Sequence, residues 1–256
     1  MTGTVAVVTG AAGDIGLAIA QRLSDNHDKI ILADIDAEAV AKLCDGRNER
    51  FVPATCDVTN EADCAELATF AACHGSVNAL INNAGAARAA SLGETTAEIN
   101  RQDIALNLEA AFLTFKAFET ALKKSRGSIV NIASVNGLAV FGHPAYSAAK
   151  AGLIHLTKLI AVEYGKYGIR CNAIAPGTVK TQAWEARAAA NPNVFEDAKR
   201  WYPLQRVVDP TDVANAVAFL SGNEASAITG VCLAVDCGLL AGQAELARTF
   251  SQSDNY

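Results

Sequence analysis

Residues 9–16 read TGAAGDIG, and they connect a short apolar run, Val5–Val8, to an amphipathic stretch, Ile15–Ser24. Glycines between a buried strand and a helix let the backbone approach a pyrophosphate, which the free N–H groups at the helix N-terminus bind. The stretch therefore predicts a dinucleotide-binding turn, and the alternative is a glycine-rich turn without a ligand. Its glycines fit two spacings, TGxxGxxG and TGxxxGxG, and in the second spacing Asp14 takes the place of the middle glycine.

Apolar runs and helix-length segments alternate along the whole chain. Continuous short apolar runs are typical of buried parallel strands. The alternation predicts an α/β fold: a single-domain, Rossmann-type doubly wound fold with a central, mostly parallel seven-stranded sheet and helices on both faces. The predicted strands are Val5–Val8, Ile30–Ala33, Phe51–Cys56, Val77–Ile81, Ser128–Ile132, Ile169–Ile174 and Val231–Val235. The predicted helices include Ile15–Ser24, Glu61–Cys73, Arg101–Lys124, Ala145–Tyr167 and Pro210–Leu220.

No internal repeat or linker divides the chain, so we expect one domain over residues 1–256. The alternation is interrupted at residues 181–206, a connection long enough to predict a substrate loop. Residues 239–256 form a polar tail, which is either a disordered end or a segment that packs across a subunit boundary.

Composition narrows the classes of partner. The formal net charge is −6, which provides no basic field for nucleic acid or an anionic membrane. The 7 cysteines are scattered and include no CxxC pair, so they indicate neither a disulfide framework nor a zinc site. No His, Asp and Cys cluster suggests a metal. With no leader-like N-terminus and no apolar run long enough to span a membrane, the chain is expected to be cytoplasmic.

Two carboxylates follow predicted strands and bear on the cofactor. Asp34 lies about 20 residues after the last glycine, where a carboxylate binds the ribose diol of NAD and repels the 2′-phosphate of NADP. A solvated strand end is the alternative for Asp34, and Asp36 could be a helix cap. Asp57 and Val58, at the end of the next strand, are expected beside the adenine, although an ordinary strand terminus is nearly as good an interpretation.

Tyr146 and Lys150 are four residues apart in a predicted helix, which puts them on one face, and Ser134 lies twelve residues before Tyr146. A tyrosine has an ordinary pKa near 10, so acid/base catalysis near neutrality requires stabilisation of the phenolate. Lys150 and an oxidised nicotinamide are both cations that could supply it, and Ser134 could donate a hydrogen bond to the substrate oxygen. A Tyr and Lys pair alone is more often an ordinary helix surface.

Together with Asn82-Asn83-Ala84-Gly85, Asn107 and the segment Pro176–Thr181, these residues resemble the short-chain dehydrogenase/reductase family from about Val5 to Gly238. The resemblance is to its compact branch, within which Asp14 is a departure; a benign role for Asp14 is a helix N-cap. It implies that Tyr146 is the general acid/base and that Ser134 orients the substrate oxygen. It implies that Lys150 binds the nicotinamide ribose and lowers the pKa of Tyr146, and that Asn107 holds a water for proton relay. Bland alternatives are strand-end stabilisation for Asn82 and Asn83, and a helix cap or kink for Asn107.

The predicted site has a cofactor side and a substrate side. The predicted cofactor contacts are Gly10, Gly13, Asp14, Ile15, Gly16, Asp34, Asp57, Val58, Asn83, Ala84, Gly85, Tyr146, Lys150, Pro176, Gly177, Val179 and Thr181. The candidate substrate walls are Asn136, Val140, Phe141, His143, Trp184, Trp201 and Tyr202, with a structural role the more common one for His143.

The function expected is that of an NAD(H)-dependent oxidoreductase acting on a secondary alcohol or ketone, such as a sugar, polyol, hydroxy acid or cyclic alcohol. The resemblance also implies a homotetramer. The alternatives are an NAD-sensing regulatory protein on the same fold and a sugar-nucleotide epimerase. An intact set of Ser134, Tyr146 and Lys150 disfavours the first, and the chain lacks the C-terminal substrate domain usual in the second.

Overall fold

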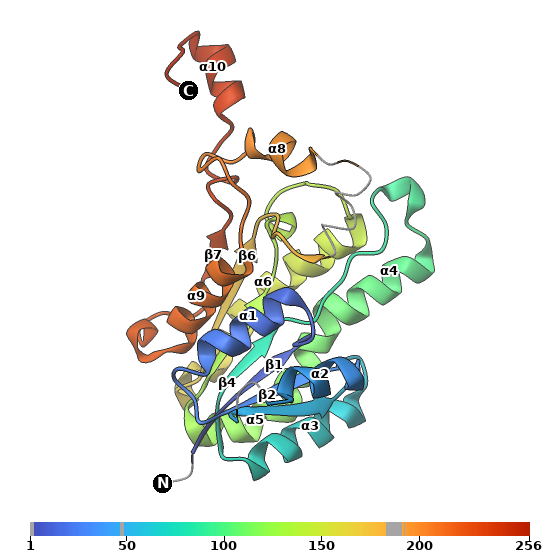
Figure 1. Ribbon diagram of the computed structural model, residues 1–256, viewed down its shortest axis with the longest axis vertical. Coiled ribbons are helices and arrows are strands. Elements are labelled where there is room, and N and C mark those ends of the chain that lie inside the picture. Colours follow the sequence, from blue (N-terminus) through green and yellow to red (C-terminus); the bar gives the residue numbers. More distant parts are fainter. Residues whose placement is uncertain (1–2, 47–48, 183–190, 192) are drawn as a thin grey trace.

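The computed structural model describes residues 3–46, 49–182, 191 and 193–256, and these form one α/β domain around a central sheet (Figure 1). The sheet has 7 strands, all parallel, in the order β3-β2-β1-β4-β5-β6-β7. The strands are β1 (Thr4–Thr9), β2 (Lys29–Asp34), β3 (Phe51–Thr55), β4 (Ser76–Asn82), β5 (Ser128–Ile132), β6 (Arg170–Pro176) and β7 (Cys232–Val235). The predicted fold class is therefore confirmed.

Helices cover both faces of the sheet. The α-helices are α1 (Asp14–Leu23), α2 (Ala37–Cys44), α3 (Glu61–Cys73), α4 (Ala97–Ile104), α5 (Ala110–Ser125), α6 (Pro144–Tyr164), α8 (Val194–Lys199), α9 (Pro210–Ser221) and α10 (Ala244–Ser251). Short 3-10 turns are η1 (Leu92–Glu94), η3 (Val135–Gly137), η4 (Gly165–Tyr167) and η5 (Asn223–Ala225). Among the described helices, none is long and apolar enough to cross a membrane.

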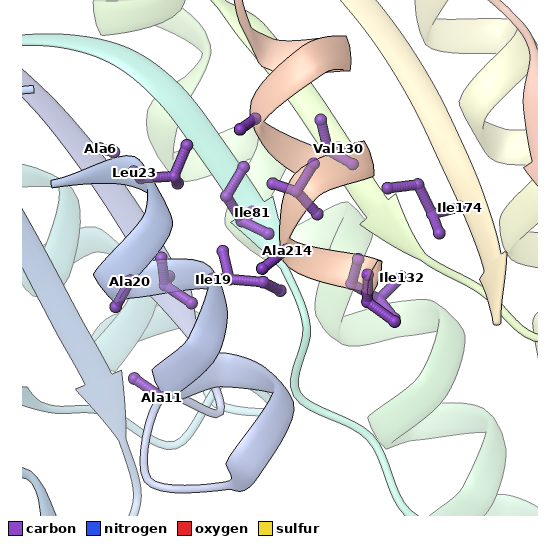
Figure 2. Close-up of a cluster of buried hydrophobic side chains, with 14 of the residues drawn as sticks. Ala6, Ala11, Ile19, Ala20, Leu23, Ile81, Val130, Ile132, Ile174 and Ala214 are labelled. Carbon is purple, nitrogen blue, oxygen red and sulfur yellow. The ribbon is translucent and has the colours of Figure 1, made fainter. Parts of the chain in front are cut away.

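The alternation of side chains along each strand divides the core into two layers. In β1, Ala6 and Val8 pack with α1, α2 and α9, whereas Val5 and Val7 pack on the opposite face with α3, α5 and α6. Figure 2 shows the first layer, in which Ile19 of α1 meets Ile81 of β4 and Ala214 of α9. Because both faces are covered, the inner strands β1, β4, β5 and β6 are largely buried along their length and mainly apolar.

The chain reverses direction of winding between β1 and β4, and this places the carboxyl ends of these two strands beside an open crevice. The glycine turn follows β1 there. Gly10 has a φ of +62°, and a Cβ on Gly16 would lie 2.3 Å from the Gly10 carbonyl oxygen, so a side chain fits at neither position. The turn is therefore shaped for close approach of backbone to backbone.

Two predicted elements differ from the structure. The segment predicted as one helix, Arg101–Lys124, comprises the end of α4, a π-helical turn (η2, Ala105–Glu109) and α5. The tail, predicted to be either a disordered end or a segment packed across a subunit boundary, contains α10, which Figure 1 shows lying apart from the body of the molecule. The connection at 181–206 contains α8, and residues 183–190 and 192 of it lie outside the described part of the chain.

Candidate active site

Two cavities open at the carboxyl ends of the strands. The larger, of about 840 Å³, lies over β5, β6 and the start of α6, and the smaller, of about 370 Å³, lies over β2 and β3. The loop that follows β4 belongs to both, because Gly85, Ala86 and Ala87 line the larger cavity whereas Ala84 and Arg88 line the smaller one. An elongated ligand with two ends would fit this arrangement.

Ser134, Tyr146 and Lys150 all line the larger cavity. Ser134 lies just after β5 and caps η3, its hydroxyl accepting a hydrogen bond from the Asn136 N–H at 3.2 Å. Tyr146 and Lys150 lie one turn apart on α6, with Lys150 Nζ 5.5 Å from the centroid of the Tyr146 ring. The structure therefore brings together the three side chains that the sequence predicted to act as a unit.

Burial dominates the electrostatics of this group. It raises the pKa of Tyr146; the Ser134 hydroxyl opposes the shift, and the Asp103 carboxylate adds to it. Lys150 is fully enclosed and donates a hydrogen bond to the Ile132 carbonyl at 2.7 Å, and desolvation lowers its pKa to about 7. Lys150 was predicted to lower the pKa of Tyr146. In the chain without a cofactor, burial has the larger effect, and the pKa of Tyr146 is raised.

Asn107 lies within the π-helical turn, so it is part of an irregularity of the helix, as the structural interpretation predicted. Its side chain also offers a polar atom that the predicted water-holding role would use. Its Nδ2 donates to the carbonyls of Ala86 and Asp103, at 2.8 and 2.9 Å. Its Oδ1 is buried and has no hydrogen-bond partner among the described residues. A Cβ on Gly85 would lie 2.7 Å from that oxygen and 3.2 Å from Lys150 Nζ, so both polar atoms border the same small space.

The smaller cavity contains the carboxylates that the sequence assigned to the adenosine side. Asp34, Asp57 and Val58 line it, together with Gly10 and Ala84. Asp34 accepts hydrogen bonds from the N–H groups of Ala12 and Asp36, at 3.0 and 3.1 Å, so it also holds the glycine turn. Asp36 caps α2, as one interpretation predicted.

Several predicted cofactor contacts have a structural role. Asn83 donates from Nδ2 to the carbonyls of Thr9 and Gly10, which fixes the glycine turn to β4. Gly13, Asp14 and Gly16 line neither of the two cavities.

The N-cap role predicted for Asp14 is wrong, because the N-cap of α1 is Gly13 and Asp14 is the first helical residue. Its carboxylate instead accepts a hydrogen bond from the Gln182 N–H at 2.7 Å. The side chain is therefore directed to the connection that follows β6, and Ile15, one residue later, lines the larger cavity.

The segment after β6 borders the larger cavity. Pro176, Gly177, Val179 and Thr181 line it. The segment is held by a bridge between Val179 and Val208 and by the Thr178 N–H, which donates to the Tyr202 hydroxyl at 3.0 Å. Tyr202, predicted as a substrate wall, is thus a buried support that also lines the cavity.

The remaining predicted substrate walls also lie at the larger cavity, except Trp184, which is outside the described residues. Phe141 and Trp201 are partly exposed there, and His143 lines the cavity while its Nδ1 lies 2.9 Å from the Ala89 carbonyl oxygen. Sequence reasoning missed Leu239 and Gln243, which come from the start of the tail. No local pattern distinguishes them, because only the return of the chain past β7 brings them to the cavity.

Sequence reasoning also missed Arg88 and Asp103, which form an ion pair of 2.6 Å beside the smaller cavity. Neither lies in a recognised motif. The one signal available was a charged residue, Asp103, at a position of α4 that faces inward.

Comparisons with known proteins show which proteins this chain is similar to. Residues 10–240 match the sequence model of the family described as enoyl-(acyl carrier protein) reductase. An uncharacterized oxidoreductase from Schizosaccharomyces pombe is 41% identical over 259 residues, which are 99% of this chain and 98% of the relative. The crystal structure of an oxidoreductase of the short-chain dehydrogenase/reductase family from Burkholderia thailandensis is 43% identical, covers 100% of both chains and has a TM-score of 0.94. The ligand-free aldohexose dehydrogenase of Thermoplasma acidophilum is 34% identical, with 94% of this chain and 95% of that one covered and a TM-score of 0.84.

Proposed function

The chain belongs to the short-chain dehydrogenase/reductase family, and on that premise we propose that it is an NAD(H)-dependent oxidoreductase acting on a secondary alcohol or ketone. One observation carries the proposal: Ser134, Tyr146 and Lys150 line a single cavity that is continuous with the loop bordering the adenosine-side cavity. Sugars, polyols, hydroxy acids and cyclic alcohols are the substrate classes to test.

The residues present fit a nicotinamide dinucleotide. The two cavities accommodate its two halves, Asp34 offers a carboxylate for a ribose diol, and the glycine turn leads into the N-terminus of α1, whose free N–H groups suit a pyrophosphate. When bound, such a cofactor accepts or donates the hydride, and its oxidised ring carries a positive charge that favours a neighbouring phenolate. We propose the cofactor contacts predicted from the sequence, with the glycines at the pyrophosphate and the segment Pro176–Thr181 at the nicotinamide, but with the Asp14 carboxylate directed to Gln182 instead of the cofactor.

The side chains divide the proton chemistry among them. In the oxidation direction, the Tyr146 phenolate accepts the hydroxyl proton of the alcohol, and in reduction the phenol returns it to the carbonyl oxygen. The Ser134 hydroxyl donates a hydrogen bond to that oxygen and holds it in place. When Lys150 is protonated, its ammonium stabilises the phenolate by its charge. Asn107 Oδ1, buried without a partner among the described residues, holds a water that passes protons between Lys150 and solvent.

The first test compares the rates at which the chain reduces NAD and NADP. NAD and NADP are each offered with the four substrate classes, and NADH or NADPH formation is followed by absorbance. We expect turnover with NAD to exceed that with NADP, because Asp34 repels a 2′-phosphate. Faster turnover with NADP would overturn the cofactor assignment.

Replacement of the proposed acid/base separates an enzyme from an NAD-sensing protein. In Tyr146→Phe, kcat should fall by about 10³-fold or more, because general acid/base catalysis contributes about that factor. The dissociation constant for NAD, measured by calorimetry, should stay within about twofold, since the phenol oxygen contributes little to ground-state binding. Tyr167→Phe, at a partly exposed position beyond the end of α6, is the matched control and should behave as wild type. Unchanged turnover in Tyr146→Phe would contradict the proposal.

A further inference from the structure

A buried carboxylate that takes no part in the proposed proton transfer lies beside the smaller cavity. The side chain of Asp103 is only 1% exposed, although it lies in α4, whose neighbouring polar residues face solvent. A buried carboxylate requires a compensating charge or hydrogen bonds, because desolvation strongly disfavours the ionised form. Arg88 supplies both: its guanidinium Nη1 lies 2.6 Å from Asp103 Oδ1, and its own N–H lies 3.5 Å from Oδ2.

Arg88 is at the same time a wall of the adenosine-side cavity. It lines that cavity with Asp34 and Asp57. Its side chain is 37% exposed. Among the described lining residues of this cavity, Arg88 is the one cation. A guanidinium binds phosphate through paired N–H donors more effectively than any other side chain. Arg88 would therefore favour a 2′-phosphorylated adenosine if its donors were free.

The ion pair opposes phosphate binding, because it holds the guanidinium against α4 through Nη1. The charge of Arg88 is then balanced by Asp103, while the carboxylates of Asp34 and Asp57 remain in the cavity wall. The local charge is net negative, which opposes an additional phosphate by Coulomb repulsion that the partly enclosed cavity screens less than bulk water does.

We propose that Asp103 is a specificity-determining residue for the cofactor, and that it enforces the choice of NAD over NADP by holding Arg88 away from the ribose 2′ position. This inference rests on the proposed function, since it assumes that the smaller cavity takes the adenosine half of the dinucleotide. Two carboxylates then act against NADP. Asp34 repels the 2′-phosphate directly, and the buried Asp103 holds Arg88, the cation that would attract it.

The experiment measures dissociation constants for NAD and NADP by isothermal titration calorimetry, so it requires no substrate. In Asp103→Asn, the ratio of NADP affinity to NAD affinity should rise about tenfold, because the freed guanidinium gains a charge-assisted contact with the phosphate. Asp103→Leu leaves no unpaired polar group in the buried position and provides a second way to release Arg88, with the same expected rise. Melting curves and circular dichroism establish that each variant is folded.

Two controls locate the effect. Glu98→Gln removes an exposed carboxylate from the same helix, outside the cavity, and should leave the affinity ratio at the wild-type value. The double variant Arg88→Gln/Asp103→Asn should lose the gain, because the released guanidinium is gone.

The outcomes distinguish this inference from the proposed function. A wild-type chain that binds neither dinucleotide would overturn both. A wild-type chain that prefers NAD, with an affinity ratio that changes less than twofold in folded Asp103→Asn and Asp103→Leu, would overturn this inference alone. A gain that persists in the double variant would also reject it, because Arg88 would not be the group responsible.

Discussion

Lys150 is a charged side chain in a position that disfavours charge. It is buried, it has no carboxylate partner within the described part of the chain, and desolvation lowers its pKa to about 7 from an ordinary 10.5. Between these two pH values the unfolded chain holds a proton on this lysine that the folded chain has released. Stability linked to Lys150 therefore rises as the pH increases above about 7.

This linkage gives a prediction for the cofactor-free protein. In wild type, the free energy of unfolding should gain up to about 1.4 kcal/mol per pH unit from this group between pH 7 and 8.5, relative to a variant without it. Lys150→Met removes the titrating group but keeps an apolar side chain of similar length. The difference in unfolding free energy between the two proteins, measured by urea denaturation at several pH values, should therefore depend on pH and favour the variant most at pH 6.5.

Lys158→Met, at an exposed position of the same helix, should show a pH-independent difference from wild type. A pH-independent difference for Lys150→Met as well would mean that Lys150 stays protonated in the folded chain across this range.

The sequence predicted the pairing of Tyr146 and Lys150 but not their electrostatics. A spacing of four residues in a helix follows from the helical repeat, which is local. The upward pKa shift of Tyr146 depends on how much of the ring the cavity wall covers and on Asp103, more than forty residues away in the chain. Desolvation depends on the tertiary structure, so the sequence motif alone does not predict the direction of the pKa shift of Tyr146.

The start of α1 connects two distant segments. Asp14 is the first residue of the helix, and its carboxylate holds the Gln182 N–H at the beginning of the connection between β6 and α9. That connection includes residues that line the larger cavity, among them Trp201. Asp14 thus holds one end of a segment that borders the larger cavity, next to Thr181, which lines it.

Replacement of Asp14 should consequently affect substrate more than cofactor. In Asp14→Gly we expect the dissociation constant for NAD to stay within about twofold, and KM for the substrate to rise about fivefold, the equivalent of one lost hydrogen bond of about 1 kcal/mol. Asp14→Asn retains an acceptor and should keep KM near the wild-type value. Calorimetry and initial-rate kinetics measure the two quantities, and a large loss of NAD affinity in Asp14→Gly would instead assign the carboxylate a direct contact with the cofactor.

The π-helical turn between α4 and α5 shows where prediction of elements from sequence fails. The apolar periodicity of Arg101–Lys124 predicted one continuous helix, and the structure inserts η2 (Ala105–Glu109) within it. One added residue in a helical turn barely alters the periodicity, because the flanking turns retain theirs. The turn is stabilised by distant contacts, such as Asn107 with the Ala86 carbonyl, which no local pattern encodes.

The helix of the tail, α10, has no buried residue and exposes two large apolar side chains. Leu246 is 52% exposed and Phe250 is 80% exposed, and their spacing of four puts them on one face of α10. Exposed apolar surface on an ordered helix is typical of an interaction site. We expect the helix to pack on a neighbouring subunit within a homotetramer.

Size-exclusion chromatography tests this expectation. A chain ending at Gln243 should elute as a smaller species than the full chain, and activity should be measured on both. The shortened chain retains Leu239 and Gln243, so the described wall of the larger cavity stays intact. Leu246→Ser/Phe250→Ser should reproduce the change in elution, whereas Glu245→Gln, on the same helix, should not. Identical elution and activity in all four proteins would dismiss a role for the tail in assembly.

Most of the architecture was predictable, because the inner strands are short, mainly apolar runs that both layers of helices bury. The sequence predicted Ser128–Ile132 and Glu61–Cys73 with the observed bounds. What the sequence did not predict lies where the chain leaves the sheet. The ion pair of Arg88 with Asp103 joins a loop to a helix through tertiary packing, and the contribution of Leu239 and Gln243 depends on the path of the chain after β7.

The hydrogen bonds of Asn83 have a consequence for the order of events during synthesis. Its side chain holds the carbonyls of Thr9 and Gly10 across 74 and 73 residues of sequence. A nascent chain that ends before β4 contains all three glycines of the turn and lacks the residue that fixes their carbonyls. Non-local contacts of this kind form late, after the entropy of closing the intervening loop has been overcome. The conformation of the turn is thus completed when β1 and β4 meet, and it is a property of that encounter rather than of the eight-residue motif.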